Sequence, residues 1–532
     1  MATQRFDAVV VGAGFAGLYM MHLLRGEGLS VKGLERAGGV GGTWYWNRYP
    51  GCRCDVESLD YSYQFSDPLQ QEWVWTERYS AQPEILAYAE HVATRFELRP
   101  LIQFETSVTS ARYDEHTHRW TVATDTGDVF DTRFLIMATG CLSAANTPAF
   151  PGLRDFNGRT FHTGLWPQNG VDFTGRRVGI IGTGSSAIQS IPLIAAEAAD
   201  LTVFQRTANF SVPARNRPSD PATVARVKSN YPDYRRRARQ QAAAFGPDNP
   251  RGLDSVLAAT PEERQRRFEE YWQLGGFMFL GAFGDLMLNE AANAYAADFV
   301  RSKIREVVKN PETAELLCPK GIIGCKRLCA DTGYYETYNR ANVHLVDVSQ
   351  HPVERFTTRG LVTGGVEYTF DDIVFATGFD AMTGSLLRMD IRGKGGVSLN
   401  EKWAAGPLTY LGLMIAGFPN LFTMTGPGSP SVLANMVTGV EQHAEYIHDV
   451  ITWLRKENAN AVEARIDAER DWVQTVNVRS QLTLYPRCNS WYLGANVPGK
   501  PRVFMPYIGF PDYTAKLQDV RTEHFAGFEL QR

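Results

Sequence analysis

Two segments of the chain show the same succession of patterns: a short apolar run, a glycine-rich turn, and then apolar positions at helical spacing. The first run covers residues 8–11 and leads into Gly12-Ala-Gly14-Phe-Ala-Gly17, after which the helical spacing continues to residue 25. A continuous apolar run is typical of a strand buried on both faces of a parallel sheet. A second run, residues 29–34, ends at Glu35, 23 residues after Gly12. This order of elements predicts a βαβ dinucleotide-binding unit.

The same succession recurs further along the chain. A strand pattern over residues 177–181 precedes Gly182-Thr-Gly184-Ser-Ser-Ala187, a helical pattern runs from about 187 to 199, and a strand over 201–204 leads to Arg206. Arg206 stands 24 residues after Gly182, almost the spacing of Glu35. Glu can accept a hydrogen bond from a free ribose 2′-hydroxyl, whereas Arg can neutralise a 2′-phosphate. The first unit therefore fits FAD or NAD and the second fits NADPH, with a solvated strand-end charge as the alternative for Arg206.

A weaker repeat indicates the domain organisation. Residues 108–140 and 346–378 each run strand, turn and strand, and each ends in an apolar strand that closes on Ala-Thr-Gly. The second repeat is expected to lead the chain back into the first domain. We predict an α/β fold with two dinucleotide-binding (Rossmann-like) domains of the two-dinucleotide flavoprotein type. The FAD domain would comprise residues 1–150 and 380–532, and the NADP domain residues 151–213 and 331–379.

Residues 214–330 are expected to form an all-helical insertion in the second domain. Thr260-Pro-Glu-Glu263 is typical of a helix start, with a capping Thr, Pro at the first position and Glu three residues after the cap. Further on, Ala292, Tyr295, Ala296, Phe299 and Val300 recur at helical spacing. This spacing predicts one buried helix face, which we interpret as core rather than as a partner-binding surface.

Composition excludes several classes of protein. The chain has 54 Lys and Arg against 58 Asp and Glu, a net charge of −4, so it lacks the basic excess that nucleic acid or an anionic membrane would require. With 44% apolar and 21% charged residues, wholesale disorder is also excluded. The longest apolar stretch, residues 274–284, is too short to span a bilayer.

The cysteines indicate a reducing environment. Seven are present, an odd number, and neither Cys52 with Cys54 nor Cys325 with Cys329 has a second pair at zinc spacing. We therefore expect no disulfide framework, no metal site and a cytoplasmic location. We interpret both close pairs as structural or incidental.

Two further motifs carry a resemblance to a known family. Residues 41–55 match the pattern [AG]-G-x-W-x-x-x-x-[FY]-P-[GM]-x-x-x-D through Gly42, Trp44, Tyr49, Pro50, Gly51 and Asp55. Residues 156–167 match F-x-G-x-x-x-H-T-x-x-W-P through Phe156, Gly158, His162, Thr163, Trp166 and Pro167. Together with the two glycine motifs and residues 490–499, these resemble the type I Baeyer–Villiger monooxygenases over nearly the whole chain. The resemblance implies an FAD- and NADPH-dependent enzyme that inserts one oxygen atom from O2 beside a ketone carbonyl, through a flavin peroxide, to give an ester or lactone.

The resemblance also implies roles for individual residues. Arg327 would stabilise the peroxide anion and the tetrahedral adduct, since an Arg does not deprotonate, and Asp55 would orient it. Lys326 would join Arg206 and Thr207 on the 2′-phosphate, and Trp491 would line the nicotinamide ribose. The other cofactor contacts are expected from Gly12, Gly14, Ala16, Gly17, Glu35, Thr43, Trp44, Trp46, Tyr61, Val108, Met436, Thr183, Gly184, Ser185, Ser186 and Gln189.

His162 is expected to act with Trp166 in locking the linker between the two nucleotide domains, rather than in the chemistry. The loop of residues 426–436 resembles that of the phenylacetone and steroid monooxygenases within the family. Ser431, Val432, Leu433 and Met436 would then line the ketone pocket, which favours aryl-alkyl or bulky cyclic ketones. Two departures leave their effects open: the turn from Met505 to Asp512 is one residue shorter with an extra Pro, and Cys52 stands where the family often has Ala.

Three alternatives to this function are weighed against it. A disulfide reductase is disfavoured because Cys52 and Cys54 are too close for a redox pair at the flavin. An N- or S-oxygenating flavin monooxygenase would share the cofactors but not the requirement for Arg327. A redox sensor on a decayed scaffold is disfavoured because Arg327, Asp55 and both glycine motifs are present. The expected partners are a small ketone and O2, in a monomer or weak homo-oligomer.

Overall fold

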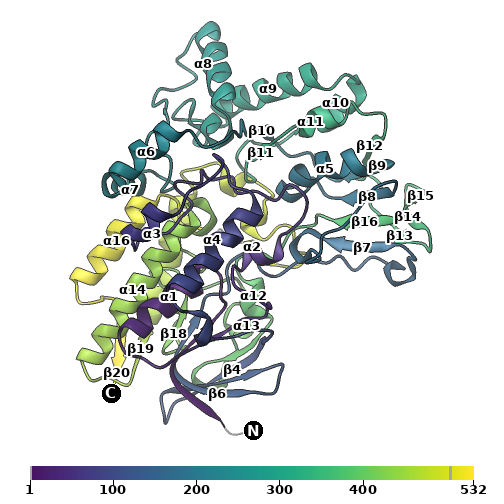
Figure 1. The fold of residues 1–532 in the computed structure, drawn as a ribbon. Helices are drawn as coiled ribbons and strands as arrows, with labels where there is room; N and C mark the ends of the chain where they lie inside the picture. The colour runs from purple at the N-terminus through teal and green to yellow at the C-terminus, as the bar shows by residue number, and fades with distance from the viewer. Residues whose placement is uncertain (1–2, 503–505) are drawn as a thin grey trace.

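The computed structural model describes residues 3–502 and 506–532, and its first sheet is built from both ends of the chain (Figure 1). β1 is parallel to both β2 and β6, as a dinucleotide-binding unit requires. The chain returns to this sheet after residue 380, because β17 pairs with β4 and β18 with β6. In spatial order the strands are β17 (Asp390–Arg392), β4 (Val108–Asp114), β5 (Arg119–Thr124), β6 (Val129–Met137), β1 (Gln4–Val11), β2 (Val31–Leu34) and β3 (Ile102–Gln103), with β18 (Leu421–Thr423) beside β6.

The second sheet is parallel throughout and lies at the right of Figure 1. Its strands, in spatial order, are β12 (Val343–Asp347), β9 (Asp200–Gln205), β8 (Arg177–Ile181), β16 (Asp372–Phe375) and β7 (Arg159–His162). The predicted α/β architecture is therefore confirmed. A smaller sheet consists of β13 (Arg355–Phe356), β14 (Gly360–Thr363) and β15 (Val366–Thr369). In addition, β10 (Ser211–Pro213) pairs with β11 (Cys329–Asp331), and β19 (Ala461–Ala464) pairs with β20 (Phe528–Gln531).

Each Ala-Thr-Gly segment packs against the first glycine of its own dinucleotide motif. Gly12 has a φ of +109°, and a Cβ there would lie 2.5 Å from the carbonyl oxygen of Ala138. Gly182 has a φ of +118°, and a Cβ there would lie 2.4 Å from the carbonyl oxygen of Ala376. Both the left-handed conformation and the close approach require glycine. The weak sequence repeat therefore corresponds to the same packing in both sheets.

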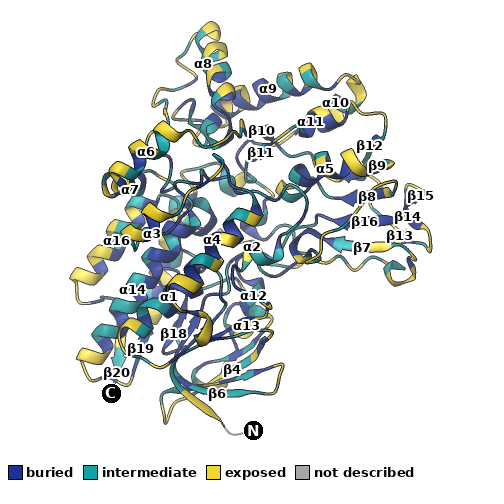
Figure 2. Ribbon diagram, viewed as in Figure 1, coloured by how far each residue is buried: buried dark blue, intermediate teal, exposed yellow. Residues whose placement is uncertain are grey.

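Helices follow both glycine turns and cover the sheets. α1 (Phe15–Gly26) packs against α14 (Met436–Lys456), and α5 (Ser185–Glu197) begins two residues before its predicted start. Outside the insertion, the remaining helices are α2 (Thr43–Trp46), α3 (Asp67–Glu72), α4 (Gln82–Arg95), α11 (Tyr334–Thr337), α12 (Gly384–Leu387), α13 (Leu399–Lys402), α15 (Ile466–Ser480) and α16 (Phe510–Thr522). Figure 2 shows β8 and β9 largely buried in the second sheet, the edge strand β7 more exposed, and the outer faces of the helices exposed.

Between the paired strands β10 and β11 the chain is mainly helical and lies at the top of Figure 1. The Thr260 side chain accepts a hydrogen bond from the Glu263 amide, which confirms the predicted helix start. The predicted buried face is wrong at Tyr295, which is 43% exposed, because its ring lies 4.1 Å beneath the Arg264 guanidinium at the surface. The helical elements here are α6 (Pro221–Ser229), α7 (Tyr231–Arg239), α8 (Pro261–Leu274), η4 (Gly276–Gly281), α9 (Glu290–Val307) and α10 (Pro311–Leu317).

The cysteines differ from the prediction at one pair. Cys325 and Cys488 form a disulfide, which is not expected from the sequence, and Cys325 is therefore structural rather than incidental. The partner lies 163 positions along the chain, a separation that gives no sequence signal. The other cysteines are free and buried: Cys52, Cys54, Cys141, Cys318 and Cys329. Across residues 3–502 and 506–532, no helix is both long and apolar enough to cross a membrane.

Candidate active site

The two glycine turns leave the N-termini of two long helices open. Gly14 and Gly184 are the N-caps of α1 and α5, and neither helix has a side chain capping its first amides. Such free N–H groups are suited to bind phosphate oxygens. A Cβ on Gly184 would meet nothing within 4 Å, so its approach is open, whereas one on Gly14 would lie 3.4 Å from Cα of Gly42. The residues present therefore fit the pyrophosphates of two dinucleotides.

Glu35 lies at the end of β2, over the first glycine turn. Its two carboxylate oxygens accept hydrogen bonds from the amides of Ala13 and Ala37, each at 2.7 Å. Burial raises its pKa, and the two amides oppose that shift. Val108 packs in the same core cluster as Val11 and Leu34, at the carboxyl ends of β1 and β2. These two predicted contacts therefore flank the place where a ribose would lie.

The segment of residues 41–55 reaches across the first glycine turn. Gly42, with a φ of +54°, opposes Gly14 and precedes Thr43, the first residue of α2. The Trp44 indole donates a hydrogen bond of 3.2 Å to the Tyr61 hydroxyl, and the Trp46 ring lies 4.6 Å from the Arg36 guanidinium. Ala16 and Gly17 are buried within α1. The aromatic side chains predicted for the cofactor are thus gathered beside the turn.

The same segment also contacts the second domain through Gln189 of α5. The Tyr49 hydroxyl donates to the Gln189 side-chain oxygen at 2.9 Å, and the Gln189 amide nitrogen donates to the Arg53 carbonyl at 3.1 Å. A Cβ on Gly51 would lie 2.4 Å from the Gln189 carbonyl oxygen, and φ there is +79°. Only glycine fits that position. Gln189 therefore joins the two nucleotide-binding units.

The second glycine turn gathers the residues predicted to hold NADPH. Thr183 donates from its hydroxyl to the Thr207 carbonyl at 2.8 Å, beside Arg206 at the end of β9. Burial lowers the pKa of Lys326, and the nearby positive charge of Arg206 lowers it further. The two cations therefore share a neighbourhood, which fits a doubly charged phosphate. Ser186 contacts the Thr163 hydroxyl at 3.1 Å, and Ser185 contacts the Cys329 sulfur at 3.2 Å.

Arg327 is held by groups from separate parts of the chain. Its Nε and Nη2 donate to the two carboxylate oxygens of Asp55 at 2.6 and 2.8 Å, and its Nη1 donates to the Val432 carbonyl at 2.7 Å. The Arg327 and Asp55 side chains are 24% and 23% exposed. Burial alone would lower the pKa of Arg327, but the Asp55 carboxylate outweighs it and raises that pKa. The guanidinium is therefore a fixed, permanent positive charge.

The predicted substrate loop meets this arginine. Val432 of η6 (Ser431–Leu433) supplies the carbonyl that accepts from Arg327, and it packs in one apolar cluster with Leu433 and Met436. Ser431 contacts the Met382 sulfur at 3.7 Å. The same cluster includes Cys141, Leu142, Ala381, Tyr485, Trp491 and Tyr492. The loop and the C-terminal aromatic residues thus form an apolar surround for the cation.

Part of the shortened C-terminal turn can be described. Met505 lies outside the described residues, but the amide of Tyr507 donates to the Ser429 carbonyl at 2.7 Å. The extra proline, Pro511, stands in the first turn of α16, where a missing N–H costs no intrahelical hydrogen bond. Gly509, with a φ of +97°, is the N-cap residue directly before this helix. The turn is therefore attached to the same loop that carries Val432.

His162 is the last residue of β7, at the edge of the second sheet. Its Nδ1 accepts from the Gly164 amide at 2.9 Å, and its Nε2 lies 3.3 Å from the hydroxyl of Thr377 in the second Ala-Thr-Gly segment. Burial lowers its pKa, so the ring is neutral. The amide of Trp166 donates to the Trp46 carbonyl. These contacts join the 156–167 motif to both sheets, and its role in locking the two domains stays a prediction.

Sequence reasoning missed two side chains at Arg327. The Phe277 ring of η4 lies 4.7 Å from the Arg327 guanidinium, a cation–π contact from the helical segment. Tyr492 also lies beside Arg327: burial raises the pKa of the Tyr492 hydroxyl, and the positive charge of Arg327 partly offsets that rise. Neither residue belongs to a motif, so only the three-dimensional arrangement reveals them. Cys52, a departure from the family pattern, is buried near Tyr49, and burial raises the pKa of its thiol to about 12.

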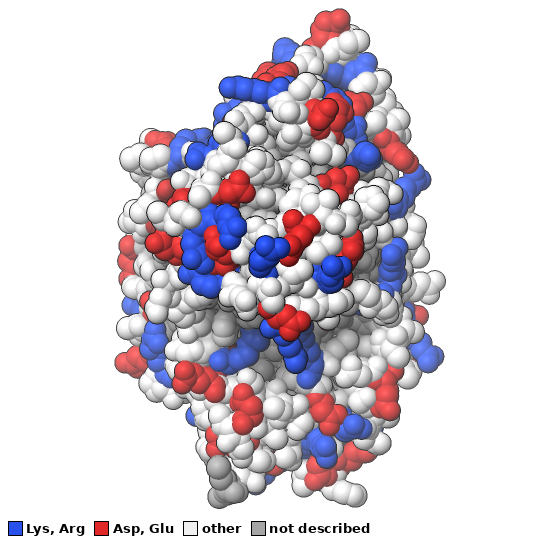
Figure 3. Space-filling view, turned by 90° about the vertical axis from the view of Figure 1, so that its right-hand side faces the viewer, with Lys and Arg blue, Asp and Glu red and all other residues white. Residues whose placement is uncertain are grey.

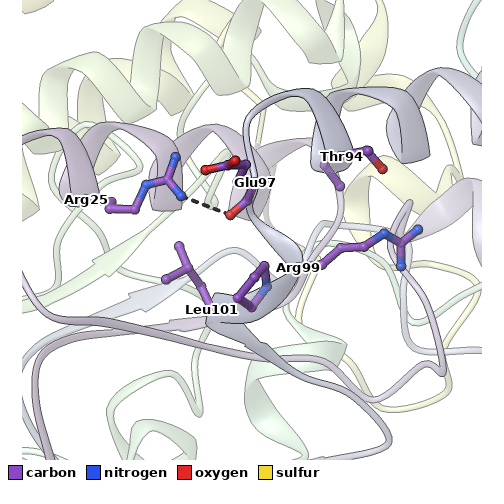
Figure 4. Close-up of a pocket in the computed structure, with 7 residues that line it drawn as sticks. Arg25, Thr94, Glu97, Arg99 and Leu101 are labelled. Carbon is purple, nitrogen blue, oxygen red and sulfur yellow. Dashed lines mark hydrogen bonds between the residues drawn. The ribbon is translucent and has the colours of Figure 1, made fainter.

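A surface pocket elsewhere does not coincide with this site. It has a volume of about 490 Å³ and lies at the C-terminal end of α1, opposite the glycine turn (Figure 4). Arg25 donates there to the Glu97 carbonyl at 2.9 Å. The pocket is lined by Arg25, Ala93, Thr94, Glu97, Arg99, Pro100 and Leu101. It contains none of the predicted site residues.

Surface charge and possible metal ligands also bear on the choice of site. On the face drawn in Figure 3, Lys and Arg side chains are interspersed with Asp and Glu rather than gathered into a patch of one sign. Within the described part of the chain, no group of three or more His, Cys, Asp or Glu residues could hold a metal ion. The site around the two glycine turns therefore stays the candidate functional site.

Comparison with known proteins identifies close relatives over the whole chain. A family model described as flavin-binding monooxygenase-like matches residues 6–217. A Baeyer–Villiger monooxygenase from Pseudooceanicola batsensis is 44% identical over 99% of this chain and 96% of its own length. A phenazine N-monooxygenase from Lysobacter antibioticus is 43% identical, covering 99% and 97%.

Solved structures agree with these relatives. An oxidized steroid monooxygenase bound to NADP superposes with a TM-score of 0.94 at 53% identity, covering 99% of this chain and 100% of that one. The complex of OTEMO with FAD and NADP superposes with a TM-score of 0.95 at 40% identity, covering 99% of each chain. At this identity and coverage, the similarity shows a shared family as well as a shared fold.

Proposed function

The chain belongs to the Baeyer–Villiger monooxygenase family, and we propose that its reaction takes place where Arg327, Asp55 and Val432 meet. The enzyme depends on FAD and NADPH, and its overall reaction converts a ketone, O2, NADPH and a proton to an ester or lactone, NADP+ and water. Bound FAD, reduced by NADPH, supplies the activation of oxygen. The observation that carries the proposal is the doubly hydrogen-bonded Arg327–Asp55 pair, which lies against the loop predicted to line the ketone pocket.

Arg327 would stabilise the negative charge that develops on oxygen as the carbonyl is attacked. A fixed charge in a partly buried site is effective because it needs no reorganisation during the reaction. Asp55 orients the guanidinium through two hydrogen bonds, and the Val432 carbonyl fixes a third nitrogen. Asp55 is thus proposed as a positioning residue and Arg327 as the catalytic one.

Lys326, Arg206 and Thr207 are proposed to bind the 2′-phosphate of NADPH, and Trp491 to lie near its nicotinamide ribose. The mutual proximity of Arg206 and Lys326 supports the phosphate site. The open N-terminus of α5 supports pyrophosphate binding there, with Gly184 and Ser185 closest to the phosphates. Glu35, Val108 and the open N-terminus of α1 are proposed to bind the FAD adenosine and pyrophosphate in the same way.

We propose aryl-alkyl or bulky cyclic ketones as substrates. Support comes from the apolar and aromatic surround of Arg327, in which Val432, Leu433, Met436 and Tyr492 take part. The solved steroid monooxygenase, at 53% identity, acts by its name on a bulky cyclic skeleton. A cytoplasmic location and a monomeric or weakly associated state stay predictions from the sequence.

A second candidate reaction, oxygenation of nitrogen or sulfur, is favoured by one observation. A relative that is 43% identical over nearly the whole chain is named a phenazine N-monooxygenase. Soft nucleophiles do not need a cation to stabilise a carbonyl adduct, so this chemistry would not explain the Arg327–Asp55 pair. The two reactions therefore differ in their dependence on Arg327.

Product analysis with purified, FAD-loaded enzyme and NADPH tests both candidates. Phenylacetone, cyclohexanone and a steroid ketone would be offered beside a thioether and a phenazine, and the products identified by mass spectrometry. Ester or lactone from a ketone, absent with Arg327→Ala, is the expected result. N-oxide or sulfoxide with no ester from any of the ketones would overturn the ketone assignment in favour of the second candidate.

A further inference from the structure

The disulfide Cys325–Cys488 joins two irregular segments that both reach the Arg327 site. Cys325 lies in the loop of residues 318–328, directly before Lys326 and Arg327. Cys488 lies in the C-terminal segment of residues 484–494, which carries Trp491 and Tyr492 in η8 (Trp491–Leu493). The two Cα atoms are 5.9 Å apart, a normal separation for a disulfide. A covalent bond therefore connects the proposed catalytic loop to the proposed nicotinamide segment.

Noncovalent contacts also hold these two segments in place. The loop is anchored upstream of Cys325 by Ile323, which exchanges two hydrogen bonds with the buried Asn293 side chain of α9. The C-terminal segment is anchored at its start by the Leu484 amide, which donates to the Met287 carbonyl at 2.9 Å. The Arg487–Glu290 ion pair is more than 60% exposed on both sides and contributes little. Packing of Trp491 and Tyr492 with Val432 also keeps the C-terminal segment beside Arg327, and the disulfide adds a covalent link between that segment and the loop.

We propose that Cys325 and Cys488 form a redox modification site, in which the oxidised pair holds the 484–494 segment against the Arg327 loop and the reduced pair releases it. The oxidant is hydrogen peroxide, which arises when NADPH and O2 are consumed without oxygen transfer. In that step two thiols and one H2O2 give the disulfide and two water molecules. Each thiol loses one proton and one electron, and the peroxide O–O bond breaks.

Exposure distinguishes Cys488 from its buried partner Cys325 and from the free cysteines. Cys488 is partly exposed, so a small oxidant or reductant can reach it, whereas Cys52, Cys54, Cys141, Cys318 and Cys329 are buried. Burial also raises the pKa of the thiols of Cys52 and Cys329 to about 12, which keeps them in the unreactive neutral form. Disulfides in reducing compartments are usually transient or redox-sensing, which fits a reversible link.

The effect of the disulfide on turnover rests on the role proposed for Arg327. The existence of the disulfide does not depend on that role. With the link closed, Trp491 and Tyr492 are kept beside Arg327, and bound NADP+ is retained. With the link open, the segment can move away, so NADP+ dissociates more readily and more peroxide escapes. The reduced enzyme should therefore yield at least twofold more H2O2 per NADPH and bind NADP+ at least threefold more weakly.

The experiment compares FAD-loaded wild type, Cys488→Ser and Cys318→Ser, each oxidised with dilute H2O2 or reduced with a phosphine. Non-reducing peptide mapping should detect a Cys325–Cys488 peptide in oxidised wild type and Cys318→Ser only. NADP+ affinity and the H2O2 to NADPH ratio should respond to reduction in those two proteins. Cys488→Ser should stay at the reduced values under both treatments.

Two results would overturn the proposal: no Cys325–Cys488 peptide after oxidation, or NADP+ affinity that is the same in the oxidised and reduced wild type. Both readouts are independent of ketone oxidation, so failure of the proposed substrate assignment would leave them intact. If Cys488→Ser folds poorly, Cys488→Ala and reduced, alkylated wild type serve the same comparison.

Discussion

Arg327 and Asp55 lie 272 residues apart in the sequence, yet the Arg327 guanidinium donates to both carboxylate oxygens of Asp55, at 2.6 and 2.8 Å. Two parallel hydrogen bonds fix the plane of a guanidinium as well as its position. The Val432 carbonyl holds the third nitrogen, and the Phe277 ring covers the group at 4.7 Å. The cation is therefore immobilised between the segment of residues 41–55, the loop of residues 426–436 and the helical segment.

Replacement of Arg327 by Ala should abolish ester formation while FAD stays bound. Loss of one fixed group that stabilises a developing oxyanion costs about 10²- to 10³-fold in rate. Arg327→Lys should also be impaired, because an ammonium cannot reproduce the two parallel bonds to Asp55. Ester yield by gas chromatography and the flavin absorbance of the purified variant measure the two effects. Arg305→Ala, which breaks an exposed ion pair with Glu315, is the matched control and should keep the wild-type rate.

Replacement of Asp55 by Asn should lower the rate of ester formation at least tenfold, because an amide has one oxygen where the guanidinium needs two acceptors. If Asp55 acts through Arg327, the two changes are not additive. The double variant Arg327→Ala with Asp55→Asn should then be no slower than Arg327→Ala alone. Independent losses that multiply in the double variant would show that Asp55 has a separate function. Asp55→Glu should restore part of the rate by keeping the carboxylate.

The dinucleotide units were predictable because local rules dictate them. The order of strand, glycine turn and helix at Gly12 and Gly182 depends on neighbouring residues, and both Ala-Thr-Gly segments follow from the same packing. The Asp55–Arg327 pairing was predictable only through the family resemblance, since no local pattern connects residues so far apart.

The contacts that were missed depend on tertiary structure. Phe277 reaches Arg327 from η4, and Cys488 reaches Cys325 from the C-terminal segment, and neither contact leaves a periodic pattern. Tyr295 shows the opposite failure: its helical spacing indicated the core, but stacking with Arg264 keeps its ring at the surface. Hydrophobic periodicity identifies a helix face and cannot identify which neighbour covers each position.

Removal of the positive charge at Arg206 or Lys326 should weaken NADPH binding selectively. A hydrogen bond to a charged group contributes about 1.5–3 kcal/mol, which corresponds to a roughly 10- to 100-fold rise in the KM for NADPH. NADH lacks the 2′-phosphate, so its KM should change little in Arg206→Ala or Lys326→Ala. Steady-state oxidation of NADPH and of NADH by the same preparation gives the two KM values, and NADH acts as the internal control. Equal effects on the two coenzymes would contradict the phosphate site.

A buried carboxyl at Asp60 should make stability depend on pH. The Tyr234 hydroxyl and the Gly246 amide donate to one of its oxygens, and the other has no hydrogen-bond partner among the described residues. Burial raises the pKa of Asp60 to about 7, although Arg235 opposes this shift and Glu57 adds to it. An unfolded Asp has a pKa of about 3.9, so between about pH 4 and 7 the folded state binds the extra proton. The stability that this proton provides is complete below pH 4 and is lost as the pH rises through 7.

Asp60→Asn should therefore flatten the decline of the unfolding midpoint between about pH 5 and 7, because the amide keeps the acceptor for Tyr234 and cannot ionise. The slope that it removes is at most about 1.4 kcal/mol per pH unit. Glu441 and Asp331, whose pKa values burial raises to about 7 and about 6, leave part of the slope in place. Asp371→Asn is the control of opposite sign: hydrogen bonds from Arg177 lower the pKa of Asp371 to about 2, so its contribution is constant above pH 5. A variant Asp60→Asn that declines as steeply as wild type over this range would show that Asp60 is ionised throughout.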